Sequence, residues 1–183
     1  MRNKIYYGDV RETLPQLWQY KAQMCVTSPP YYGLRDYGGE DKQVGQEETP
    51  EEYINNMVEI FRLVRDNLQD DGTLWLNIGD SYYNYRPGKG QSYPKQSVSK
   101  TKQDLPDKCN KRGNKLEGLK EKDLIGIPWM LAFALRQDGW YLRQDIIWHK
   151  PNPMPESVRD RCTKAHEYIF LFSKSKKYFY DNE

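Results

Sequence analysis

The chain has 183 residues, of which 37% are hydrophobic and 30% charged, a composition that predicts one soluble domain whose core can fold without disulfides or metals. No apolar run approaches the roughly 20 residues of a transmembrane helix, and the first residues lack the apolar stretch of a signal peptide. The three cysteines and two histidines have no metal-binding spacing, which argues against structural zinc and for a reducing cytoplasm.

Short apolar runs alternate with amphipathic stretches along the chain. The predicted strands are 4–7, 22–26, 73–78, 140–148, 167–172 and 178–180, and the predicted helices are 10–17, 50–72 and 128–136. The second helix has the clearest start, because Thr49 is a natural N-cap and Glu52 completes a capping box. This order predicts an α/β sheet with helices on its faces and a ligand crevice at the carboxyl ends of its strands.

Residues 85–122 differ from the rest of the chain in charge. They hold eleven Lys and Arg against four Asp and Glu, a net charge of +7, so the remaining residues carry −5. With almost no apolar residue, this segment predicts a long mobile loop within the domain. Its charge suits a phosphate backbone, although a solvated insertion without a partner explains the composition equally well.

The most informative strand end is the sequence TSPPYYG at 27–33. Two consecutive prolines fix the backbone and remove two N–H groups, so the Ser28 hydroxyl and the Pro29 carbonyl form a rigid set of acceptors beside Tyr31. Acceptors next to an aromatic ring suit the exocyclic amine of a heterocycle, which the ring stacks on. The alternative is an ordinary loop that two prolines end.

These residues resemble a known family. Ser28-Pro29-Pro30-Tyr31 is similar to the catalytic tetrapeptide of the amino-group DNA methyltransferases, the N4-cytosine and N6-adenine enzymes. Further similar blocks are YGDV at 7–10, TSPPYYGLRDYG at 27–38, GTLWLNIGDSY at 72–82, KDLIGIP at 122–128, DIIWHKPNPMP at 145–155, and residues 161–181. They cover nearly the whole chain in the order of the β-type members.

The resemblance implies a Rossmann-like methyltransferase sheet with helices on both faces. It also implies that S-adenosylmethionine is the methyl donor. It implies that a base is flipped out of double-stranded DNA, that Tyr31 stacks on it, and that Ser28 and the Pro29 carbonyl accept hydrogen bonds from its amine. Pro30 completes this catalytic set. Serine at the first position is more typical of the N4-cytosine enzymes, with N6-adenine as the alternative.

Other residues match positions that contact cofactor or DNA in the family. Asp9, Val10 and Thr27 are implied near the cofactor, although Asp9 has an equally good reading as a helix cap. The residues implied to contact DNA are Tyr32, Lys89, Lys95, Lys100, Lys102, Lys111, Arg112, His149 and Lys150. For the His149-Lys150 pair the alternative is a solvated loop, and Asp80 either bonds within the pocket or only ends its strand.

The chain departs from the family in one respect. Members with this block order carry a later Phe-x-Gly-x-Gly turn that holds the cofactor, and this sequence has none. Residues 1–183 are therefore expected to form a partial catalytic domain, incomplete in its sheet, in a bacterial, archaeal or phage-encoded cytoplasmic protein. A second polypeptide or a self-dimer would complete the cofactor site. The alternative from another class is a non-catalytic DNA-binding module.

Overall fold

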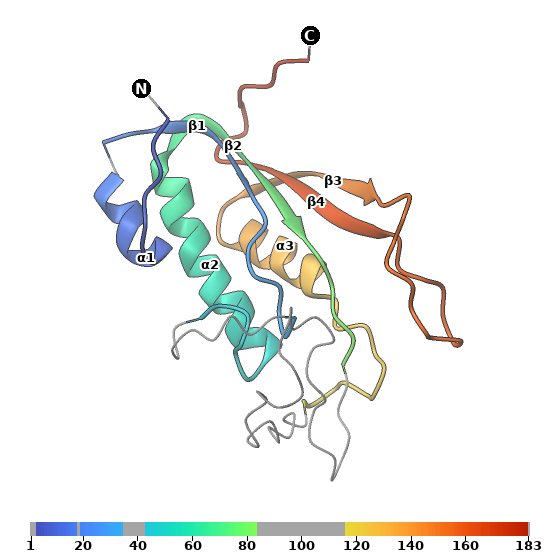
Figure 1. Ribbon diagram of the computed structural model, residues 1–183. Helices are drawn as coiled ribbons and strands as arrows, with labels where there is room; N and C mark the ends of the chain where they lie inside the picture. Colours follow the sequence, from blue (N-terminus) through green and yellow to red (C-terminus); the bar gives the residue numbers. More distant parts are fainter. Residues whose placement is uncertain (1–2, 18, 35–42, 84–115, 183) are drawn as a thin grey trace. The chain divides into compact units, whose positions relative to one another are not determined.

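A computed structural model describes residues 3–17, 19–34, 43–83 and 116–182 (Figure 1). The chain divides into two compact units. The first unit comprises Met1–Pro29, Asn56–Ile78 and Pro128–Glu183, and the second comprises Pro30–Asn55 and Gly79–Ile127. Within the described ranges, no helix combines the length and the apolar character needed to cross a membrane.

A four-stranded sheet forms the centre of the first unit. Its strands are β1 (Ala22–Thr27), β2 (Leu68–Ile78), β3 (Tyr141–His149) and β4 (His166–Ser173), in the order β1-β2-β4-β3. β1 pairs with β2 in parallel, and β4 is antiparallel to both of its neighbours. This mixed sheet confirms the α/β class that the alternating pattern predicts.

One face of the sheet packs against helices and forms the core. Helix α3 (Ile127–Gln137) lies behind the strands in Figure 1, as does helix α2 (Pro50–Asn67). The ring of Trp129 on α3 meets the ring of Phe170 on β4 edge to face, with centroids 5.1 Å apart. Side chains of β2 and β4 on this face, such as Leu76 and Phe172, are fully buried. Alternate residues of each strand therefore point toward the helices.

Helix α2 begins as its sequence predicts and ends earlier. The capping box is present, because the Glu52 amide donates to Thr49 Oγ1 at 3.2 Å and the Thr49 amide donates to Glu52 Oε2 at 3.3 Å. The predicted end at Gly72 is wrong, since the helix ends at Asn67 and the chain enters β2 directly. Leu68 fits the apolar spacing of the helix, but its backbone pairs with β1 and its side chain is buried there.

The predicted elements near the two ends of the chain are only partly confirmed. Residues 4–7 form no strand, and residues 178–180 make an isolated backbone bond to β2 instead of a ladder. The predicted helix 10–17 consists of a single α-helical turn, α1 (Val10–Thr13), followed by a 3₁₀ turn at Leu14–Leu17. Pro15 explains the change, because its nitrogen cannot donate to the carbonyl one turn earlier.

Candidate functional site

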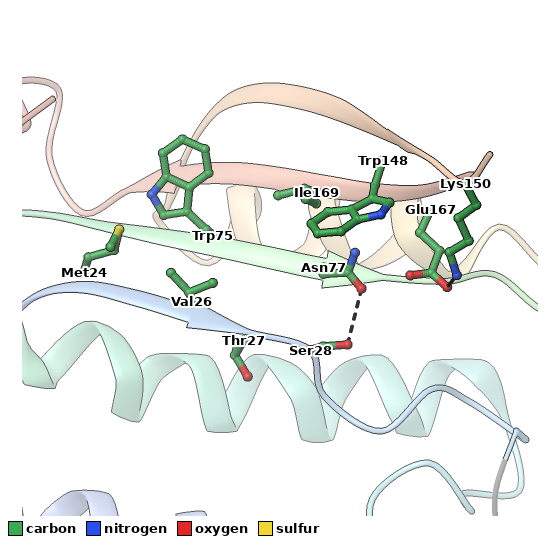
Figure 2. Close-up of a pocket in the computed structure, with 10 residues that line it drawn as sticks. All are labelled: Met24, Val26, Thr27, Ser28, Trp75, Asn77, Trp148, Lys150, Glu167 and Ile169. Carbon is green, nitrogen blue, oxygen red and sulfur yellow. Dashed lines mark hydrogen bonds and ion pairs between the residues drawn. The ribbon is translucent and has the colours of Figure 1, made fainter. Parts of the chain in front are cut away.

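A pocket of about 640 Å³ lies along one face of the sheet of the first unit and reaches the carboxyl ends of β1 and β2 (Figure 2). Its lining combines apolar, aromatic and polar side chains: Met24, Val26, Thr27, Ser28, Trp75, Asn77, Trp148, Lys150, Glu167 and Ile169. Ser28 directly follows β1, whose last residue Thr27 pairs with Leu76 on β2. The strand-end position predicted for this serine is therefore also the position of a pocket.

The Ser28 hydroxyl reaches across to the neighbouring strand. Its oxygen lies 3.3 Å from Asn77 Oδ1, the acceptor of a hydrogen bond that the hydroxyl donates (Figure 2). The side chain is exposed, and Pro29 follows it without an N–H. A hydroxyl whose hydrogen is committed to an amide oxygen presents its lone pairs to a ligand, so Ser28 is suited to act as an acceptor.

The wall of the pocket opposite Ser28 comes from β3 and β4. The Trp148 indole is 55% exposed and offers a flat surface (Figure 2). Lys150 forms an ion pair with Glu167, and its amide donates to the Ala165 carbonyl at 2.7 Å. His149 stands beside Lys150 at the end of β3 and pairs with β4, but it does not line the pocket.

Cys25 on β1 carries a thiol near the pocket that is not an activated nucleophile. Burial raises the pKa of its thiol. A thiol with a raised pKa stays protonated at neutral pH, whereas the thiolate is the nucleophilic form. The pocket therefore relies on oxygen acceptors and aromatic surfaces and does not place an activated cysteine beside them.

The residues after Ser28-Pro29 are held firmly within the second unit. The buried Tyr53 hydroxyl donates to the Pro30 carbonyl at 2.9 Å. The Tyr31 ring lies so close to the backbone of Gly79 that a Cβ there would come within 2.6 Å of the ring carbon Cε2. Gly79 is thus required for the observed position of this tyrosine, and the strand-end glycine acquires a specific role.

Tyr32, which the resemblance implies at the DNA, is instead buried in the second unit. It is 9% exposed, its hydroxyl donates to the Glu48 carbonyl at 3.4 Å, and its ring lies 5.6 Å from that of Tyr53. Burial, reinforced by nearby carboxylates, raises the pKa of Tyr32 to about 12. Tyr32 therefore contributes to packing in this structure, and its contact with DNA stays a prediction.

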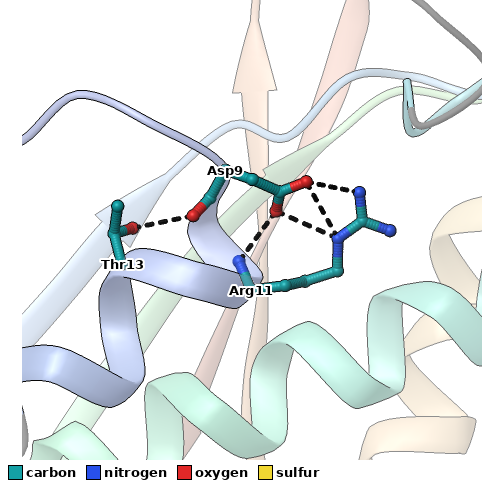
Figure 3. Close-up of polar contacts among 3 residues, drawn as sticks. All are labelled: Asp9, Arg11 and Thr13. Atoms are coloured by element: carbon teal, nitrogen blue, oxygen red, sulfur yellow. Dashed lines mark hydrogen bonds and ion pairs between the residues drawn. The ribbon is translucent and has the colours of Figure 1, made fainter.

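Asp9 caps helix α1, as its alternative reading predicts (Figure 3). Its carboxylate accepts from the Arg11 amide at 2.8 Å and from the Arg11 guanidinium at 2.6 Å, and its carbonyl accepts from the Thr13 hydroxyl at 3.0 Å. The next residue, Val10, is 36% exposed. A carboxylate suits the ammonium group of an amino-acid ligand, but here it already holds a guanidinium.

Asp80 caps a helix, a role that the sequence did not predict. Its Oδ1 accepts from the amides of Gly126 and Ile127, both at 3.0 Å, and from the Ser81 amide at 2.9 Å. Ile127 is the first residue of α3, so the carboxylate caps that helix from a distant strand end.

The sequence did not predict most of the pocket residues, among them Trp75, Asn77 and Trp148. The first two alternate with the buried residues of β2, and this period of two was the available signal. The predicted DNA contacts Lys89, Lys95, Lys100, Lys102, Lys111 and Arg112 lie outside the described residues, as does most of the basic segment 85–122.

Comparison with known proteins shows which family the chain belongs to. Residues 22–183 match the model of the N6 and N4 methyltransferases, described as DNA methylase. The Type II methyltransferase M.SmaI of Serratia marcescens is 54% identical across 98% of this chain and 59% of its own length. M.Cfr9I of Citrobacter freundii is 49% identical across 98% and 57%. The chain thus spans somewhat under three fifths of these relatives.

Solved structures show the same fold at lower identity. The PvuII DNA methyltransferase, named as cytosine-N4-specific, matches 94% of this chain and 49% of its own with a TM-score of 0.58 and 17% identity. A DNA modification methylase of Thermus thermophilus, solved with S-adenosyl-L-methionine, matches 96% and 55% with a TM-score of 0.59 and 21% identity. These likenesses confirm the Rossmann-like methyltransferase fold, and the match over residues 22–183 shows that the chain belongs to the DNA methylase family of N6 and N4 methyltransferases.

Proposed function

We propose that this chain forms the catalytic part of an enzyme that methylates the N4 amine of a flipped-out cytosine in double-stranded DNA. The observation that carries the proposal is the position of Ser28, which directly follows a parallel strand and lines a pocket together with Asn77 and Trp148. Hydrogen-bond acceptors and an aromatic surface in one pocket are what a base amine needs.

The chain's own residues orient the amine. The Ser28 hydroxyl and the Pro29 carbonyl accept its two hydrogens, which directs the nitrogen lone pair away from them. Asn77 keeps the Ser28 hydrogen occupied. When bound, S-adenosylmethionine would supply an electrophilic methyl group, carried on a positively charged sulfur, to the nitrogen lone pair that Ser28 and Pro29 direct. The sulfur would keep the electron pair of the broken methyl–sulfur bond, and one amine proton would pass to water.

Three residues are proposed to contact the methyl donor: Asp9, Val10 and Thr27. Thr27 lines the pocket beside Ser28. Asp9 has the charge to bind an ammonium group, and doing so would draw its carboxylate partly away from the Arg11 guanidinium. The half-exposed Lys150 and the neighbouring His149 are proposed to contact DNA at the pocket rim, together with the basic residues of 85–122.

Serine at position 28 supports cytosine as the target base, as does the cytosine-N4 specificity named for the PvuII enzyme. Because the chain spans under three fifths of its Serratia and Citrobacter relatives, we propose that residues 1–183 are a partial catalytic domain. A second polypeptide or a second copy would then complete the cofactor site. Such an enzyme meets DNA in the cytoplasm.

Methyl transfer to DNA tests the proposal. The chain is incubated with labelled S-adenosylmethionine and mixed-sequence DNA, alone and with the remaining part of the Serratia relative, and the methylated nucleoside is identified. N4-methylcytosine is expected, with Ser28→Ala lowering the rate about 10- to 100-fold through the lost acceptor. Ser175→Ala is the matched control, because that hydroxyl bonds to the Asp70 carbonyl near the other end of β2.

The outcomes separate the alternatives. N6-methyladenine would replace cytosine by adenine as the target. Salt-dependent DNA binding without methyl transfer in either mixture would support a non-catalytic DNA-binding module instead. Equal rates for Ser28→Ala and Ser175→Ala would refute the role given to Ser28.

A further inference from the structure

A buried hydroxyl on helix α2 reaches the backbone of the Ser-Pro-Pro-Tyr sequence. The Tyr53 side chain is completely buried, and its hydroxyl donates to the Pro30 carbonyl at 2.9 Å, a contact made within the second unit. Burial raises the pKa of the Tyr53 hydroxyl, so the group keeps its proton and remains a donor at neutral pH. Phenylalanine in this place would fill the same space and need no hydrogen-bond partner. The hydroxyl therefore indicates a role beyond packing.

The two prolines leave the backbone before Tyr31 with little freedom to rotate. The rings of Pro29 and Pro30 fix φ at both residues. Ser28 and Pro29 each precede a proline, which restricts ψ at these two residues to the extended range. The first rotation with appreciable freedom is therefore ψ of Pro30, which turns the Pro30 carbonyl and every residue after it. A hydrogen bond to that carbonyl fixes this rotation.

Tyr31 is the first residue that this rotation carries. Its ring lies against the backbone of Gly79, where a Cβ would come within 2.6 Å of the ring carbon Cε2. The carbonyl after it, that of Tyr32, accepts from the Ser81 hydroxyl at 2.9 Å. The backbone is thus held by Ser81 on the far side of Tyr31 and by Tyr53 on the near side.

We propose that Tyr53 is a positioning residue for methyl transfer, whose hydroxyl fixes the rotation that aims Tyr31. The proposal deepens the proposed function and rests on it, because the resemblance gives Tyr31 the task of stacking on the flipped base. A base whose stacking surface is displaced meets the methyl donor in a poorer orientation, and a misplacement of about 1 Å costs on the order of 100-fold in rate. Tyr53 is buried and acts through Tyr31, not by touching the base.

Tyr53→Phe removes the hydroxyl and keeps the ring. In whichever assembly transfers methyl groups, it is expected to lower kcat about 10-fold while KM for S-adenosylmethionine changes less than about twofold. Tyr83→Phe is the matched control, because Tyr83 is also buried in the second unit and its hydroxyl accepts from the Leu116 amide at 2.9 Å. A general loss of stability would lower the urea midpoint of both variants, whereas kcat should fall in Tyr53→Phe alone.

Nuclear magnetic resonance gives a readout that does not depend on activity. The Tyr31 ring shifts the α-proton resonances of Gly79 through its ring current, since the ring lies against that backbone. In Tyr53→Phe this shift is expected to shrink by at least half, and in Tyr83→Phe it should stay unchanged. Adding Tyr53→Phe to Tyr31→Ala should cause no further loss of rate, because the hydroxyl acts through the ring.

The outcomes separate the positioning role from the proposed function. An unchanged Gly79 shift in Tyr53→Phe would overturn the positioning role whatever the rate, and so would a reduced shift without any fall in kcat. A further loss of rate on the Tyr31→Ala background would overturn it too, because the hydroxyl would then act elsewhere. A reduced shift in a chain that transfers no methyl group in any mixture would sustain the hold of Tyr53 on Tyr31 and refute the proposed function.

Discussion

Replacing Asp80 tests how helix α3 is held in place. The carboxylate lies at the first turn of α3, where Oδ1 accepts from the amides of Ser81, Gly126 and Ile127. Removing it leaves three half-buried amide donors without this acceptor and takes a negative charge from the helix N-terminus. Loss of a helix cap costs about 1–2 kcal/mol. The charge at the helix end contributes about 0.3–1 kcal/mol more, and the remaining amide adds a similar amount.

Asp80→Ala is therefore expected to lower the free energy of unfolding by about 2–4 kcal/mol, a substantial share of the roughly 5–15 kcal/mol typical of a domain. Asp80→Asn keeps one oxygen acceptor and should lose about half as much. Urea unfolding followed by tryptophan fluorescence measures both. Asp70→Asn is the control, because the Asp70 side chain is fully exposed and its pair with Lys174 is worth little. A loss below about 0.5 kcal/mol for Asp80→Ala would refute the capping argument.

Three further predictions concern the site. In whichever assembly transfers methyl groups, Asn77→Ala should lower kcat more than it raises KM, and adding it to Ser28→Ala should cause no further loss; additive losses would show that Asn77 does not act through Ser28. Gly79→Ala should displace the Tyr31 ring and lower activity while the urea midpoint changes little, and unchanged activity would contradict the close contact. Because burial raises the pKa of Tyr32 to about 12, the neutral form stabilises the fold below about pH 10. This stability should fall by about 1.4 kcal/mol per pH unit between pH 10 and 12, a decline that Tyr32→Phe should lack if the residue is buried as described.

Local signals predicted the fold well wherever a few neighbouring residues decide the structure. Thr49 and Glu52 form the expected capping box, and Ser28 stands at the expected strand end. The wrong predictions concern segments whose structure depends on contacts with residues distant in the sequence. Leu68 has the spacing of a helix residue, yet pairing with β1 draws it into β2. Residues 4–7 have the composition of a strand but find no ladder among the described residues.

The candidate site divides along the same line. The Ser-Pro-Pro sequence is visible because its rigidity is local, whereas Asn77 became part of the site only through the register of β1 against β2. Tyr32 shows what a sequence motif leaves open. The resemblance implies a contact with DNA, which stays a prediction, whereas its burial at 9% exposure depends on packing against Tyr53 that the motif does not reveal.

Strand β1 shows how apolar residues relate to the cover that the described part of the chain provides. Its residues Ala-Gln-Met-Cys-Val-Thr include apolar side chains on both faces, the pattern of a strand covered on both sides rather than one facing water. The prediction of helices on both faces of the sheet came from the alternation of strands and helices and from the resemblance to the amino-group methyltransferases. Among the described residues, α2 and α3 lie on one face, and Val26 on the other remains 70% exposed. Among the residues that the structure describes, β1 therefore has helices on one face and an exposed Val26 on the other, which local sequence patterning alone does not foretell.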